Sequence, residues 1–112
     1  MPNPASIGQF EQLVMTAILA LGENAYGVTI HAQVEKLAQP KCVSLGAVYA
    51  TLERLEGKGL VSSRLAPGTA VRGGRAKRHY TIESDGLLAL RDAKAANDRL
   101  WAGLRLPLKG TA

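Results

Sequence analysis

Residues 43–61 have the sequence VSLGAVYATLERLEGKGLV, which predicts a capped amphipathic helix followed by a turn. Ser44 is a good N-cap, because its hydroxyl can accept a hydrogen bond from a free amide of the first turn. Apolar residues then recur at intervals of three and four, at Leu45, Val48, Leu52 and Leu55. Gly57 and Gly59 end the helix, since glycine commonly follows the last helical turn. The stretch therefore predicts a helix from Ser44 to about Glu56 with one narrow apolar face.

The opposite face of this helix carries small and hydrogen-bonding side chains. A helix that enters the major groove of DNA needs such a face, because bulky apolar side chains would hold its backbone away from the bases. Tyr49 and Arg54 are long enough to reach phosphates or base edges, and the N-terminus at Ser44 can approach a phosphate. The predicted DNA-contacting residues of the helix are Ser44, Ala47, Tyr49, Ala50, Thr51 and Arg54. An ordinary amphipathic helix with a solvated outer face fits this segment alone equally well.

Two further amphipathic helices are expected upstream, over residues 8–22 and about 27–37. The apolar face of the second one is formed by Tyr26, Ile30, Val34 and Leu37. Pro40 ends that helix. Residues 41–43 are too few for more than an isolated extended bridge.

Downstream, alternating side chains predict two strands over residues 60–65 and 77–82, joined by a glycine-containing loop. Six basic residues and no acidic one lie in residues 57–82, namely Lys58, Arg64, Arg72, Arg75, Lys77 and Arg78. A hairpin with a basic tip is suited to holding the DNA backbone or the minor groove. We assign this role to Arg72, Arg75, Lys77 and Arg78. The alternative is a solvated loop that is basic for solubility.

A last helix is expected from about Asp85 to Gly103, with Ser84 as its N-cap. Its apolar stripe is larger than a core of this size covers, which predicts a contact between two copies of the chain. The residues expected at this dimer contact or in a ligand cleft beside it are Leu90, Asn97, Leu100, Trp101 and Leu104. A helix that folds back on its own domain is the alternative. Trp101 is interpreted as an interface anchor, although a tryptophan in a dimer cleft can also stack on a flat small molecule.

The composition limits the class of protein. The chain has 112 residues, enough for one domain with a modest core, and 46 % of them are hydrophobic. A net charge of +5 favours an anionic partner, most often nucleic acid. No secretion signal or membrane-spanning run is expected, so the predicted location is the cytoplasm.

The chain also lacks the residue patterns of common enzymes. Its single cysteine, Cys42, excludes an internal disulfide and is expected to be a buried small hydrophobe, with redox sensing as the alternative. His31 and His79 lie far apart without an acidic partner motif, which argues against a metal site or a catalytic base. Catalytic triads, P-loops and dinucleotide fingerprints are not found. We therefore predict no enzymatic activity and no cofactor.

The order of helix, helix, helix, hairpin and helix predicts a winged helix-turn-helix, a mainly α fold with a β-hairpin wing (α+β). We expect a DNA-binding domain over residues 7–82. Residues 84–104 would form a C-terminal dimerisation helix packed on the same domain.

Several short motifs together resemble regulators of the PadR family. They are Phe10-Glu11 before an apolar helix, Ala25-Tyr26-Gly27, Val43-Ser44-Leu45-Gly46-Ala47-Val48-Tyr49, Leu52-Glu53-Arg54-Leu55-Glu56-Gly57-Lys58-Gly59-Leu60-Val61, and Gly73-Gly74-Arg75-Ala76-Lys77-Arg78-His79-Tyr80. The resemblance covers about residues 7–90. It implies a dimeric, usually repressing regulator that binds operator DNA and is often released by a small ligand. It also implies that Tyr49 and its helix face contact DNA, and that one C-terminal helix replaces a separate dimerisation domain.

The leading hypothesis is a homodimeric regulator that binds double-stranded DNA at palindromic sites, with a small aromatic effector as a further candidate partner. One alternative is a protein-interaction module whose basic hairpin docks an acidic partner. Another is a small-molecule sensor centred on Trp101. Only the leading hypothesis requires discrimination between a palindromic duplex and scrambled DNA.

Overall fold

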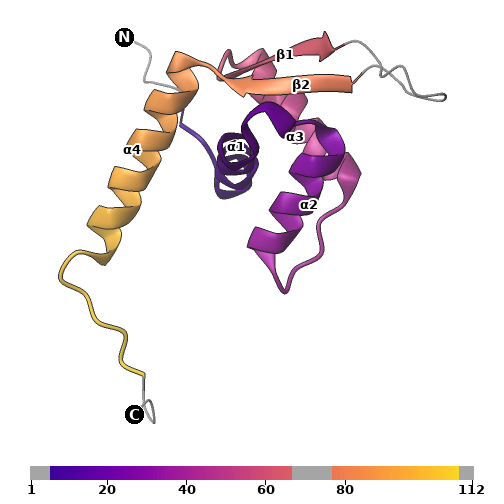
Figure 1. The fold of residues 1–112 in the computed structure, drawn as a ribbon. Coiled ribbons are helices and arrows are strands. Elements are labelled where there is room, and N and C mark those ends of the chain that lie inside the picture. Colours follow the sequence, from indigo (N-terminus) through magenta and orange to yellow (C-terminus); the bar gives the residue numbers. More distant parts are fainter. Residues whose placement is uncertain (1–5, 67–76, 109–112) are drawn as a thin grey trace.

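The computed structural model describes residues 6–66 and 77–108, which form four α-helices and a two-stranded hairpin (Figure 1). In chain order the elements are α1 (Gln9–Leu21), the short 3-10 helix η1 (Gly22–Asn24), α2 (Gly27–Ala38), α3 (Leu45–Gly57), β1 (Val61–Ala66), β2 (Lys77–Ile82) and α4 (Ser84–Trp101). The predicted element order is confirmed, and the fold is an α+β winged helix-turn-helix. None of the helices in the described ranges is long and apolar enough to cross a membrane.

The core lies where α1, α2 and α3 meet. Its buried apolar residues are Val14, Met15, Ala17, Ile18, Ala25, Ile30, Val34, Val48, Leu52, Leu55, Leu60, Val61, Tyr80 and Ala89. The apolar stripe predicted on α3 is confirmed for its three inner members, Val48, Leu52 and Leu55, which are fully buried. Leu45 and Leu37, which lie at the ends of their helices, are exposed instead. Helix α3 is therefore held against α1 and α2 by one face along most of its length.

A buried carboxylate joins the start of α1 to the end of α3. Glu11 is only 7 % exposed. Its Oε2 lies 2.8 Å from Nζ of Lys58 and 3.5 Å from Nε of Arg54, and its Oε1 accepts the backbone N–H of Gly8 at 2.9 Å. Burial by itself raises the pKa of Glu11, but the hydrogen bonds from Lys58 and Gly8 and the charges of Lys58 and Arg54 outweigh it, so this pKa is lowered. The ionised carboxylate is the form that this site stabilises.

The hairpin is anchored to the connection between α1 and α2. Strands β1 and β2 pair in antiparallel fashion along their full lengths. The N–H of Tyr80 on β2 donates to the carbonyl of Ala25 at 2.9 Å, and an isolated bridge joins Tyr26 to His79. Residues 41–43, which are too few for more than an isolated bridge, form none and make up an irregular turn between α2 and α3.

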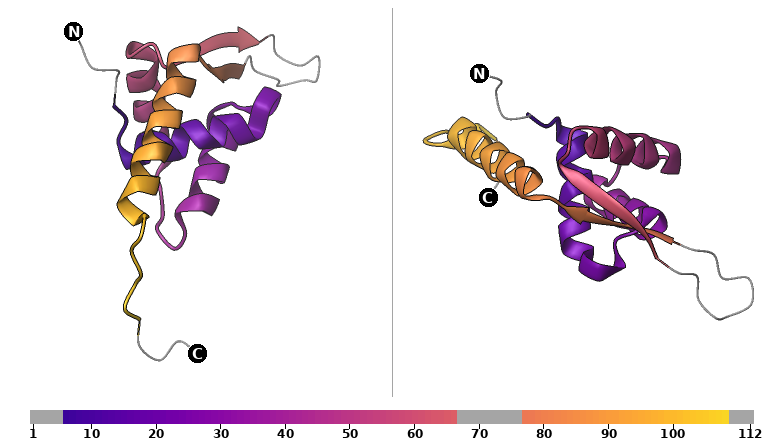
Figure 2. Two further views of the ribbon diagram at one scale, coloured as in Figure 1. Left: turned by 90° about the vertical axis from the view of Figure 1, so that its left-hand side faces the viewer. Right: turned by 90° about the horizontal axis from the view of Figure 1, so that it is seen from above.

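The two buried residues of helix α4, Gly86 and Ala89, lie at its N-terminal end against the rest of the chain. Beyond this end the helix extends away from the α1–α3 core (Figures 1 and 2). The sequence indicated Ser84 as the N-cap of α4, and this prediction is wrong. The N-cap is Glu83. The reason is that Glu83 is extended and its N–H donates to the carbonyl of Leu60 at 2.9 Å, which places the first helical residue at 84. The division of the chain into residues 7–82 and 84–104 stays a prediction.

Gly86→Ala is expected to lower the free energy of unfolding by about 1–3 kcal/mol, the usual cost of overpacking. A Cβ at this position would overlap the backbone carbonyl of Leu60 and lie 2.8 Å from Cγ2 of Ile82. A backbone carbonyl cannot turn aside as the end of a side chain can. Urea denaturation measures the change. Gly57→Ala is the control, because a Cβ there meets no atom within 4 Å, and its effect should stay below about 1 kcal/mol. Equal stability of the two variants would contradict the close packing of α4 at Gly86 against Leu60 and Ile82.

Glu11→Gln is expected to destabilise the fold by about 1–3 kcal/mol near neutral pH, and by less in acid. Because the pKa of Glu11 is lowered in the folded state, its ionised form stabilises the protein above the ordinary value of 4.5. That contribution is lost as the pH falls through the folded-state pKa. The stability difference between wild type and variant, measured by urea denaturation, should therefore shrink between about pH 7 and pH 3. A difference that does not change with pH would count against the ionic role of Glu11.

Candidate nucleic-acid interface

The exposed face of α3 carries short side chains near its N-terminus. Ser44 is the N-cap as predicted, and its Oγ accepts the N–H of Ala47 at 3.0 Å. Gly46, Ala47 and Ala50 are exposed, and a Cβ added at Gly46 would meet open space. Because the side chains here are so short, the backbone of α3 can approach a partner closely.

Thr51 is not on this exposed face, so its predicted placement there is wrong. The residue is 1 % exposed, because position 51 follows Val48 by three residues and precedes Leu55 by four, which places it on the buried stripe. Its Oγ1 accepts a hydrogen bond from the Arg54 guanidinium at 3.3 Å. Arg54 itself is exposed, but it lies between Thr51 and Glu11 and is held close to α3.

Tyr49 lies over the first turn of α2. A Cβ added at Gly27 would overlap the hydroxyl and ring of Tyr49, so the missing side chain at Gly27 makes room for the ring. Tyr49 still keeps 45 % of its surface exposed. The side chain is therefore placed by α2 and remains available to a partner.

Three elements meet beside Tyr49: the start of α2, the middle of α3 and the ends of β1 and β2 that lie next to the hairpin loop. They surround a shallow hollow of about 330 Å³, and Lys77 and Arg78 are among the residues that line it. Nζ of Lys77 lies 4.2 Å from the ring centroid of Tyr26, a cation–π contact. Nη1 of Arg78 donates to Oγ of Ser63 at 3.1 Å. Lys77 and Arg78, where β2 begins after the loop, thus place two cations beside Tyr49 of α3, and we call these two residues the hairpin base.

Two of the four basic residues assigned to the hairpin, Arg72 and Arg75, lie outside the described residues. Lys77 and Arg78 are the two that the structure places. Both are exposed.

Glu53 is an exposed residue on α3 that was not among the DNA-contacting residues predicted from the sequence. It lies one helical turn after Tyr49, and this spacing alone was enough to place it on the outer face. A carboxylate at such a position can accept a hydrogen bond from the amino group of cytosine. The acidic Glu56 of α3 also acts on Tyr80 of the hairpin. Burial and the charge of Glu56 raise the pKa of Tyr80, whereas the charge of Arg78 lowers it.

The residues predicted at the dimer or ligand cleft are spread along α4 and just beyond it. Leu90 is half-buried against the core, and Asn97 is exposed. Leu100 is 67 % and Trp101 52 % exposed, while Leu104 lies exposed past the end of the helix. In the single chain these side chains do not form one cleft, so a shared cleft between two copies stays a prediction.

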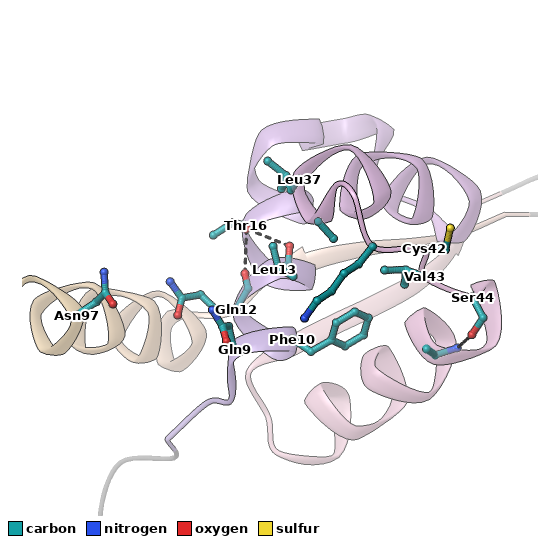
Figure 3. A pocket seen from close by; sticks show the side chains of 13 residues that line it. Gln9, Phe10, Gln12, Leu13, Thr16, Leu37, Cys42, Val43, Ser44 and Asn97 are labelled. Atoms are coloured by element: carbon teal, nitrogen blue, oxygen red, sulfur yellow. Dashed lines mark hydrogen bonds between the residues drawn. The ribbon is translucent and has the colours of Figure 1, made fainter. Parts of the chain in front are cut away.

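Asn97 alone among them lines an open hollow of about 950 Å³ between α1, the α2–α3 turn and α4 (Figure 3). The hollow is lined by Gln9, Phe10, Gln12, Leu13, Thr16, Leu37, Ala38, Lys41, Cys42, Val43, Ser44, Ala47 and Asn97. Cys42 is exposed, so its expected burial is wrong, because it lies in the turn that connects α2 to α3. In residues 6–66 and 77–108, His, Cys, Asp and Glu side chains form no group of three that could hold a metal ion.

A sequence model of the transcriptional regulator PadR-like family matches residues 16–92. The matched range contains α2, α3 and both strands, so it covers the exposed face of α3 and the hairpin base. A search of curated protein sequences found no match.

Solved structures share the fold. A PadR family transcription regulator from Clostridium difficile R20291 is 26 % identical, with a TM-score of 0.63 over 85 % of this chain and 92 % of that one. Bacillus subtilis PadR, solved in complex with operator DNA, is 20 % identical, with a TM-score of 0.57 over 93 % and 52 % of the two chains. Bordetella bronchiseptica BpsR, whose DNA binding is described as regulated by 6-hydroxynicotinic acid, is 18 % identical, with a TM-score of 0.61 over 94 % and 72 %.

Gly27→Ala is expected to move Tyr49 while leaving the protein about as stable as before, within about 1 kcal/mol. The added methyl group takes the space of the Tyr49 hydroxyl, and an exposed side chain can turn away at low cost. A crystal structure of the variant and its urea denaturation curve measure the two effects. Gly46→Ala, which adds a methyl group in open space on α3, should leave Tyr49 in place. If Tyr49 stays and α2 shifts instead, the account of this contact is wrong.

Proposed function

Because the chain belongs to the PadR-like family of transcriptional regulators, we propose that it binds palindromic operator DNA as a homodimer and represses transcription. The observation that carries the proposal is the exposed face of α3, whose side chains are short, with the two cations of the hairpin base, Lys77 and Arg78, beside it. The proposal gives the chain no catalytic role and no cofactor.

Helix α3 is assigned to the major groove. Gly46, Ala47 and Ala50 let its backbone approach the base edges, and the α3 N-terminus at Ser44 directs amides toward a phosphate. Tyr49 and Glu53 extend from the same outer face and are the side chains suited to contact bases or the sugar-phosphate backbone. Residues on this face would therefore determine which operator is bound.

Lys77 and Arg78 are assigned to phosphates at the edge of the groove, together with Arg72 and Arg75, which precede them in the sequence. Arg54 is assigned to the backbone as well, once DNA phosphates compete with Glu11 for its guanidinium. Contacts of this kind add affinity that depends on salt and little on sequence. The operator complex of Bacillus subtilis PadR supports the choice of DNA as the partner of this fold.

The dimer is assigned to α4, whose large apolar side chains are exposed in the single chain. They include Leu87, Leu88, Leu100 and Trp101. A second copy would remove this surface from water. A two-fold dimer would also place its two α3 helices about 34 Å apart, one turn of DNA, to meet a palindromic site.

Release by a small aromatic effector is the regulatory part of the proposal. Trp101 offers a flat apolar surface for stacking near the expected contact between two copies. The described regulation of Bordetella bronchiseptica BpsR by 6-hydroxynicotinic acid supports an effector of this chemical class. The alternatives, a protein-interaction module or a sensor without specific DNA reading, use the same surfaces but require no sequence preference.

The test is selection of bound duplexes from a random pool at near-physiological salt, followed by fluorescence anisotropy on the selected duplex and a scrambled control. A palindrome bound at least about a hundredfold tighter than the control supports a dimer that reads sequence. Half-sites one helical turn apart would match the expected spacing of the α3 helices. Equal affinity for both duplexes would overturn specific DNA reading and favour the interaction module.

Lys77→Ala with Arg78→Ala is expected to weaken binding to the selected and scrambled duplexes by a similar factor. Loss of about two phosphate contacts should also reduce the slope of log affinity against log salt by about 1–2. Anisotropy titrations at several salt concentrations measure both effects. The control is Arg91→Ala with Lys94→Ala, which removes two exposed charges from α4. If both double variants behave alike, net charge and not the hairpin base explains the loss.

A further inference from the structure

The turn before α3 is held by two side chains of α2. Nε2 of His31 lies 2.6 Å from the carbonyl oxygen of Val43, and Oε2 of Glu35 accepts the N–H of Val43 at 3.5 Å. The backbone N–H and the backbone carbonyl of Val43 are thus both contacted by side chains that lie one helical turn apart on α2. We call this arrangement the Val43 clasp.

The shorter contact identifies His31 as the main member of the clasp. A carbonyl oxygen only accepts hydrogen bonds, so Nε2 of His31 must carry the proton. Nε2 also lies 3.7 Å from Oε1 of Glu35, which is too far for a hydrogen bond, so among the described residues its one hydrogen bond is to Val43. The side chain of His31 is about three-quarters buried, with 24 % exposed, which limits competition from water.

The position of Val43 gives the clasp its significance. Val43 immediately precedes the N-cap Ser44, whose hydroxyl closes the first turn of α3 on Ala47. In the turn between α2 and α3, the N–H of Lys41 donates to the carbonyl of Ala38 at 3.0 Å, and this bond lies before Val43. The start of α3 is therefore placed by apolar packing and by the clasp. Figure 3 shows Val43 and Ser44 side by side at this start.

We propose that His31 is a positioning residue for DNA reading: its hydrogen bond to Val43 sets where the first turn of α3 meets the bases. This inference rests on the proposed function. Hydrogen bonds to base edges require placement within about half an ångström, whereas phosphate contacts tolerate small shifts. Loss of the bond should therefore reduce discrimination between sequences more than it reduces overall affinity.

His31→Phe removes the donor but keeps a flat ring, and His31→Gln keeps a donor that can reach a carbonyl. For His31→Phe we expect the ratio of affinities for the selected and scrambled duplexes to fall about tenfold, the size of one lost base contact, with affinity for the scrambled duplex within about twofold of wild type. His31→Gln should restore most of the ratio. Any inactive fraction of a variant weakens both titrations equally, so the ratio is not affected by partial unfolding.

Amide hydrogen exchange at Ser44, Leu45 and Gly46 gives an independent readout, and faster exchange is expected in His31→Phe than in His31→Gln. If wild type discriminates and His31→Phe discriminates equally well, the inference is overturned while the proposed function stands. If His31→Gln loses as much discrimination as His31→Phe, ring packing and not the hydrogen bond is responsible, which also overturns it. If wild type itself does not discriminate, the proposed function fails and the inference fails with it.

Discussion

The burial of one face of α3 against α1 and α2 is the constraint on which the other features depend. Val48, Leu52 and Leu55 are fully buried, so the rotation of the helix about its axis is set by apolar packing. That rotation exposes Ala47 and Ala50 and hides Thr51, only one residue farther along. A different rotation would move the short side chains into the core and leave no such face for a partner.

Apolar packing has no strong directional preference along a helix, and directed polar contacts are present at both ends of α3. At the C-terminal end, Glu11 holds Lys58 and Arg54. At the N-terminal end, His31 and Glu35 hold Val43. Buried polar groups are costly when unpaired, so such contacts penalise small displacements that apolar contacts would tolerate. These contacts tie α3 to α1 and α2 at defined points.

The charges around α3 divide the interface into two chemical regions. Lys77 and Arg78 at the hairpin base suit phosphates, whereas Glu53 on α3 repels phosphates and suits the amino groups of bases. This division orients the proposed complex, because the helix can only face the groove when the cations face the backbone. Helix α4 extends away from the α1–α3 core and leaves Trp101 exposed for the proposed dimer contact, while Asn97 lines one open hollow with Ser44 and Ala47.

Periodicity and capping in the sequence were enough to locate the helices, the hairpin and the N-cap at Ser44, because these depend on neighbours within one or two turns. Four features needed the tertiary structure. Thr51 is polar and small, and only the packing of α3 shows that it is buried. The start of α4 depends on a hydrogen bond from Glu83 to distant Leu60. The pairing of Glu11 with Lys58 joins residues 47 positions apart, and that of His31 with Val43 spans 12. Hydrogen bonds between remote segments leave no periodic signal in the sequence, so local patterns determine the elements of this protein, and only their packing decides which side chains meet.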